Sequence, residues 1–63
     1  MSEIKYEYDA IGNIIQATLG DNVVTEGQLN VPEHNKVTNE DDMAVSKAKR
    51  KKQVELFEAA LNA

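Results

Sequence analysis

The sequence of 63 residues contains no cysteine, no tryptophan, one proline and one histidine. Without cysteine the chain can form neither a disulfide bond nor a thiolate metal site. No apolar run approaches the roughly 20 residues that a membrane-spanning helix needs. A chain of this length forms one small domain, which buries only about 60% of the surface that the unfolded chain exposes. We therefore expect a single domain of marginal stability.

Catalytic and metal-binding patterns are weak. His34 is the only histidine, it lies in a polar segment, and no serine and acid stand at a spacing that suggests a catalytic set with it. Glu40, Asp41 and Asp42 are adjacent, so on a helix they point in different directions, and the spaced oxygens and glycine of a calcium loop are missing. We expect a protein that is not an enzyme and that has no cofactor, no metal site and no small-molecule substrate.

The first half of the chain has the pattern of an antiparallel β-meander. Residues 3–8 alternate strictly, with Ile4, Tyr6 and Tyr8 on one face. A turn follows, in which Asp9 can bond its own backbone and Gly12 or Asn13 can take a positive φ. The strictly alternating segments and short apolar runs predict strands at 3–8, 14–19 and 23–25, with Ile15, Ala17 and Leu19 pointing inward. Alternation at 28–31 predicts a fourth, edge strand as an alternative to a three-stranded sheet.

The second half predicts one long helix. Thr38 or Asn39 can cap it, and the acidic residues at 40–42 suit the first turn of a helix, where negative charge complements the helix dipole. Strong helix formers dominate up to the end of the chain. The predicted fold class is α+β, with a meander at 1–31, a polar loop at 32–39 and a helix at 40–62. This helix would be roughly 35 Å long, against about 20 Å for a six-residue strand.

This mismatch of lengths predicts an uncovered apolar end of the helix, and hence a protein partner or self-association. Met43, Val54, Phe57 and Leu61 share one sector of the helix, and Arg50 lies in the middle of it. Buried, Arg50 would need a carboxylate; alternatively, its stem lies along apolar surface while the guanidinium reaches water. The expected partner-binding residues are Arg50, Val54, Phe57 and Leu61.

Charge divides the chain into an acidic and a basic part. Residues 1–42 hold nine acidic and two basic residues, whereas residues 43–63 hold five basic and two acidic ones, which gives a net charge of −4 overall. The basic run could bind the phosphates of a nucleic acid, although no aromatic residues interleave with it. Because the bases surround the helix axis, a membrane-surface helix is not indicated. The candidate nucleic-acid-binding residues are Lys47, Lys49, Arg50, Lys51 and Lys52.

These features favour a small non-enzymatic protein that acts in protein–protein interaction, structure or assembly, docks through its C-terminal helix, and is of the scale of viral or phage accessory proteins. The alternative is a nucleic-acid-associated regulatory protein that uses residues 47–52. An acidic surface that mimics nucleic acid ranks lower, because the carboxylates are scattered. The acidic N-terminus without an apolar segment predicts no signal peptide, and so a cytoplasmic or virion-associated protein.

Overall fold

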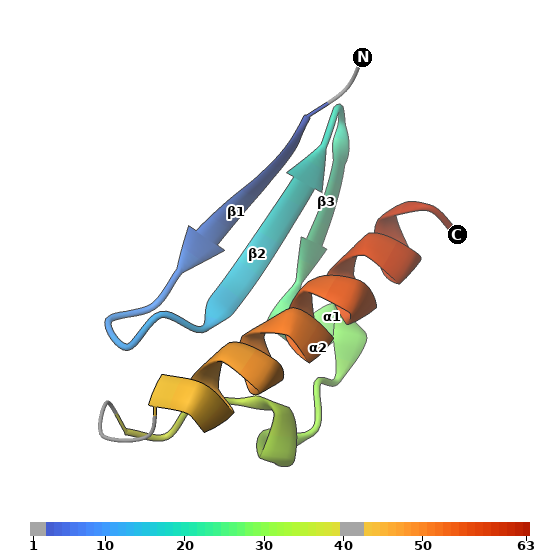
Figure 1. The fold of residues 1–63 in the computed structure, drawn as a ribbon. Coiled ribbons are helices and arrows are strands. Elements are labelled where there is room, and N and C mark those ends of the chain that lie inside the picture. The colour runs from blue at the N-terminus through green and yellow to red at the C-terminus, as the bar shows by residue number, and fades with distance from the viewer. Residues whose placement is uncertain (1–2, 40–42) are drawn as a thin grey trace.

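Three antiparallel strands form a sheet, and a long C-terminal helix lies on one of its faces (Figure 1). This computed structural model describes residues 3–39 and 43–63. The strands follow one another across the sheet in the order β1-β2-β3. Their bounds are Ile4–Tyr8 for β1, Ile14–Leu19 for β2 and Asn22–Thr25 for β3. The predicted α+β meander with a C-terminal helix is confirmed, and the described residues form three strands.

The turn between β1 and β2 is organised by Asp9, as the sequence predicted. Its carboxylate accepts hydrogen bonds from the backbone amides of Ile11 and Asn13 at 3.1 and 2.8 Å. Gly12 has a φ of +91°, which a glycine adopts without the cost that a side chain would add. The turn that joins the two strands is therefore favoured by Asp9, which binds the turn amides, and by Gly12, which takes the positive φ.

The register of β2 differs from the predicted one near its start. The pairing of β1 with β2 shifts between Glu7 and Tyr8, so that Glu7 lies opposite Gln16 whereas Tyr8 lies opposite Ile14. Ile15 is therefore the extra residue of a bulge, and it is 37% exposed while Ile14 is fully buried. The prediction that Ile15 points inward was wrong, because strict alternation does not hold through a bulge.

The segment after β3 forms helical turns instead of the alternative fourth strand. Helix α1 spans Glu26–Leu29, and a 3-10 helix, η1, spans Glu33–Asn35. The Gln28 side chain accepts a hydrogen bond from the Thr25 amide at 2.9 Å, as in a capping box. Asn30 then ends α1 in the left-handed conformation, with a φ of 51°. These local bonds favour a helical turn over the strand that alternation at 28–31 predicted.

Helix α2 spans Met43–Leu61 and supplies the centre of the core. Phe57 and Leu61 form one buried cluster with Ile14 and Ala17 of β2. The expected acidic first turn at 40–42 lies outside the described residues, as does the side chain of Met43, so capping by Thr38 or Asn39 stays a prediction. Half-buried side chains from the sheet, α1 and α2 surround the cluster: Ile4, Tyr6, Leu19, Val24, Leu29 and Val54.

The apolar end of α2 is covered by the chain itself. Leu61 is only 5% exposed. With 19 residues, α2 is roughly 28 Å long, and it contacts η1 as well as β2 and β3. Figure 1 shows its first turns beside the β1–β2 turn and the segment that follows α1. The expected uncovered apolar end is therefore not at Leu61, which packs against the sheet with Ile14 and Ala17. The side chain of Met43, at the other end of the predicted stripe, lies outside the described residues, so for that end the expectation stays a prediction.

Candidate interaction site

One face of α2 is committed to packing within the chain. Ser46, Gln53, Phe57 and Leu61 are buried, and their spacings of seven and four residues place them on one stripe of the helix. Val54 is half-buried against the same core. Leucine and phenylalanine at this spacing bury apolar surface against the sheet, and that burial is the main force holding α2 in place.

Three expected partner anchors therefore take part in the chain's own packing. Phe57 is fully buried and Leu61 nearly so, and Val54 packs against the same cluster. The intramolecular core accounts for the apolar stripe without a second molecule. In this fold Phe57 and Leu61 cannot act as exposed anchors for a partner, so a docking surface on α2 has to lie elsewhere on the helix.

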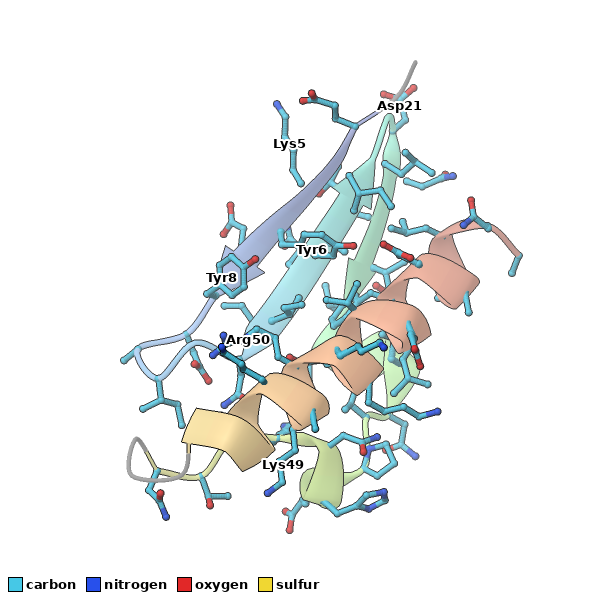
Figure 2. All side chains as sticks on the ribbon, viewed as in Figure 1. Lys5, Tyr6, Tyr8, Asp21, Lys49 and Arg50 are labelled. Carbon is cyan, nitrogen blue, oxygen red and sulfur yellow. The ribbon has the colours of Figure 1, made fainter. Side chains whose placement is uncertain are left out.

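Arg50 contacts the β1–β2 turn. Its Nε donates a hydrogen bond to the carbonyl oxygen of Gly12 at 3.1 Å, and Figure 2 shows the guanidinium directed at this turn. A Cβ built on Gly12 would lie 2.7 Å from the Arg50 Nη2 atom. Arg50 is half-buried and has a carbonyl partner; no ion pair with a carboxylate is found for it within the described residues. Arg50 therefore positions α2 on the turn. Of the two predicted arrangements, a buried ion pair or a side chain lying along apolar surface, the structure is closer to the second.

Two amide side chains whose hydrogen-bond partners the sequence did not indicate fix the same turn. Gln53 Oε1 accepts a hydrogen bond from the Ile14 amide at 2.7 Å. Asn13 binds the backbone of Val37 in both directions, through its Oδ1 at 2.7 Å and its Nδ2 at 2.9 Å. The signal for Gln53 was its place between Arg50 and Phe57 on the apolar stripe, where a polar residue needs a partner. Asn13 gave no such signal, because its partner lies 24 residues away.

The face of α2 that points away from the sheet carries lysines. Lys47, Lys51 and Lys52 are exposed, and we call these three residues the lysine face. Lys49 is half-buried beside it (Figure 2). Within 3–39 and 43–63, the lysine face has one ion pair, between Lys52 Nζ and Glu55 Oε2 at 4.0 Å. Both partners of this pair are more than half exposed, so it stabilises the helix very little. Most of the positive charge is thus left for water or a partner.

The rest of the surface is mostly acidic. Lys36 forms an ion pair with Glu26, which ties the segment after η1 to α1.

Burial acts to raise the pKa of the Asp9 carboxyl group, but hydrogen bonds from Asn13 and from the turn amides outweigh it, so the pKa is lowered. Asp9 therefore stays charged at neutral pH. Outside α2, the exposed carboxylates among the described residues are Glu3, Glu7, Asp9, Asp21 and Glu33. On α2, Glu55 is exposed beside the lysines.

A further polar contact joins α2 to β1. The Tyr6 hydroxyl donates a hydrogen bond to Glu58 Oε1 at 3.0 Å. Burial, together with this bond and the Glu58 charge, raises the pKa of the Tyr6 phenol to about 12. The phenol remains protonated, and thus able to donate, over the whole physiological range. Glu58 therefore belongs to the packing of the fold and not to the exposed surface of α2.

His34 is exposed on η1. In the described part of the chain, no three histidine or acidic side chains come together as metal ligands would. None of the helices described there has both the length and the hydropathy that crossing a bilayer requires.

Comparisons with protein-family models, with curated proteins and with solved structures gave no match to this chain.

Proposed function

We propose that this is a small non-enzymatic interaction protein that docks onto an acidic surface of a larger protein through the lysine face of α2. The observation that carries the proposal is the division of α2 into two sides. The apolar stripe is buried against the sheet, whereas Lys47, Lys51 and Lys52 are exposed. Docking by the C-terminal helix remains the proposal, but through lysines and not through the apolar residues at 54, 57 and 61.

The physical support is electrostatic. Lys47 and Lys51 are four residues apart and so lie one turn apart on the same side of the helix. Their ammonium groups have no carboxylate partner among the described residues, so opposing carboxylates would neutralise charge that is now only solvated. Complementary charge of this kind mainly accelerates association and selects the partner, and its effect falls with added salt. The helix is held rigidly by its buried side, so the lysines are presented without a folding step.

A nucleic acid is the second candidate, because the same exposed lysines could bind phosphates. Two observations make it the less favoured one. The chain has a net charge of −4, and exposed carboxylates lie on its strands and turns, which would repel a long polyanion. The exposed side of α2 also carries no aromatic ring on which a base could stack. A compact acidic patch on a protein avoids both difficulties.

The test is affinity capture from nuclease-treated extract, followed by binding measurements with the purified partner at several salt concentrations. The triple variant Lys47→Gln/Lys51→Gln/Lys52→Gln should weaken binding roughly tenfold, since each exposed pair is worth only a fraction of a kcal/mol to about 1 kcal/mol. The single variants Lys51→Gln and Lys5→Gln form a matched pair, because they remove the same charge from α2 and from the sheet. Lys51→Gln should weaken binding, whereas Lys5→Gln should bind the partner as the unaltered chain does. Equal binding by the triple variant would contradict the proposal. Salt-sensitive binding of duplex DNA or single-stranded RNA that the triple variant loses would favour the second candidate instead.

A further inference from the structure

The outer edge of β1 has no pairing strand among the described residues. Strand β1 is the first in the sheet order, and in the described ranges only β2 pairs with it. The opposite edge strand, β3, has four residues and runs directly into α1, which packs against it. Strand β1 has five residues without glycine or proline, and its edge faces away from the other elements (Figure 1). An edge of this kind is a template for pairing with another strand.

The helix side of β1 is also incompletely covered. The backbone of helix α2 lies close to β2 and β3, whereas β1 meets the helix through side chains such as Tyr6, which bonds Glu58. Ile4 and Tyr6 are half-buried, whereas Tyr8 is 54% exposed. Figure 2 shows Tyr6 and Tyr8 on the same side of the sheet as α2. An apolar strip therefore continues past the helix to the free edge, where a further strand would bury it.

The other side of β1 carries two charges without ion-pair partners among the described residues. Lys5 and Glu7 are exposed, and their neighbours across the strand pair are the uncharged Thr18 and Gln16. No ion pair of either side chain is found within 3–39 and 43–63. Opposite charges two residues apart on one edge form a pattern that can complement itself.

We propose that β1 pairs in antiparallel orientation with β1 of a second copy of this chain, about a two-fold axis at Tyr6. In this register Lys5 lies opposite the partner's Glu7, and Glu7 opposite the partner's Lys5. On the helix side, Ile4 lies opposite the partner's Tyr8, and the two Tyr6 side chains meet at the axis. All five residues of β1 are paired, and every cross-strand neighbour is either oppositely charged or apolar.

Other registers are disfavoured by the same residues. Sliding the strands by two residues in one direction places Lys5 opposite the partner's Lys5. Sliding them by two residues in the other direction places Glu7 opposite the partner's Glu7. A shift by a single residue brings the apolar side of one strand against the charged side of the other. Charge and alternation thus select one register.

The product is a continuous six-stranded antiparallel sheet. Because the register is even, the helix sides of the two sheets are on the same side, and both copies of α2 lie on that side. The lysine faces point away from the sheet, so the pairing leaves them accessible. The dimer does not depend on the partner proposed above, and the two proposals can fail separately.

The test is sedimentation over a concentration series with a charge-swap set of variants. The unaltered chain should show a concentration-dependent monomer–dimer equilibrium. Lys5→Glu and Glu7→Lys should each weaken dimerisation roughly tenfold, because each places like charges opposite one another at two positions. The double variant Lys5→Glu/Glu7→Lys should restore it, and a mixture of the two single variants should form a heterodimer. Asp21→Lys, with the same charge change as Glu7→Lys on the β2–β3 turn, is the control and should dimerise normally.

Cysteine cross-linking reports the register, since the chain has no cysteine of its own. A mixture of Lys5→Cys and Glu7→Cys chains should form intermolecular disulfides under mild oxidation, because directly opposed residues are close enough. Rapid cross-linking of Lys5→Cys alone would show the shifted register and overturn the proposal. A species that stays monomeric throughout the concentration series, or a dimer that the single charge reversals leave unaffected, would also overturn it. Circular dichroism of each variant, altered only at exposed side chains, verifies that the fold is kept.

Discussion

Gln53 and Ile14, 39 residues apart in sequence, are joined by a hydrogen bond in the core: the Ile14 amide donates to Gln53 Oε1 at 2.7 Å. Both residues are fully buried. The bond lies where β2 begins and where the apolar stripe of α2 crosses it. It therefore ties the helix to the sheet at a defined position, which apolar packing alone does not specify. The Gln53 Nε2 group, in contrast, is buried without a hydrogen-bond partner among the described residues.

Replacing Gln53 should show that this bond stabilises the fold. Gln53→Met keeps the volume but leaves the buried Ile14 amide without an acceptor, so we expect a loss of about 1–3 kcal/mol in the free energy of unfolding. Chemical denaturation of the two chains measures the difference. A Met variant as stable as the unaltered chain would indicate that water satisfies the Ile14 amide.

Gln53→Glu adds a dependence on pH. The introduced carboxyl group can still accept the amide bond, but burial disfavours its charged form and raises its pKa in the folded state. Stability is then lost as pH rises through that raised pKa and returns as pH falls toward about 4, the value in the unfolded chain. Denaturation at several pH values should show this trend for Gln53→Glu and not for Gln53→Met.

The contact between Gly12 and Arg50 predicts a costly substitution. Gly12→Ala combines a positive φ with a Cβ only 2.7 Å from Arg50 Nη2, so the Arg50 side chain must move and its bond to the turn is disturbed. We expect a loss of about 2 kcal/mol in the free energy of unfolding. Gly20→Ala is the control, because Gly20 also has a positive φ but nothing lies near its added Cβ. Thermal unfolding that ranks Gly20→Ala as the more harmful change would contradict the role given to Arg50.

The phenol of Tyr6 should lose its proton at a higher pH than an ordinary tyrosine does. Its phenol, with a pKa of about 12, should remain protonated at a pH where an ordinary tyrosine is half ionised. Because the pKa of Tyr6 is raised in the folded state, the protonated phenol contributes fully to the free energy of unfolding below pH 10. This contribution is lost as pH rises toward 12. Tyrosinate absorbance measures this, and Tyr6→Phe identifies the signal, since it leaves Tyr8 as the one tyrosine. Glu58→Gln should lower the pKa only in part, because burial is the largest cause of the shift. A single transition near pH 10 in the folded protein would contradict this assignment.

Truncating Phe57 should unfold the protein and not merely weaken an interface. Phe57 is the largest fully buried side chain, and replacing a buried phenylalanine by alanine costs about 3–5 kcal/mol. A domain this small has little stability to lose. Circular dichroism of Phe57→Ala should therefore show an unfolded or strongly destabilised chain. A stably folded Phe57→Ala variant that has lost only partner binding would favour the exposed-anchor hypothesis over the core assignment.

The sequence predicted the elements better than their contacts. Alternation and helix periodicity are local properties, so the strands and the helix were found from them. The bulge that turns Ile15 outward was not, because it depends on how β1 and β2 pair. The helical turn that replaced the edge strand at 28–31 depends on a hydrogen bond from Thr25 to Gln28. The apolar stripe of α2 was recognised, but its burial within the chain was not foreseen. Arg50, Gln53 and Asn13 fix the β1–β2 turn through hydrogen bonds to residues that are far away in the sequence, and local patterns do not predict such bonds.

The lysine face could be predicted only in part. Its residues are all within the basic run at 47–52, but on the sequence alone the bases surround the helix axis. Which side is exposed follows from the direction in which the sheet holds α2. Packing turns Lys47, Lys51 and Lys52 to the solvent, and holds Arg50 against Gly12.

We expect α2 to keep its apolar stripe inward and to meet a partner through the lysine face. Amine acetylation followed by mass spectrometry, with and without the captured partner, measures which lysines the partner covers. Lys47, Lys51 and Lys52 should react rapidly in the free protein and be protected in the complex, while Lys5 on the sheet keeps its reactivity. Unchanged reactivity of all three in a saturated complex would contradict the claim.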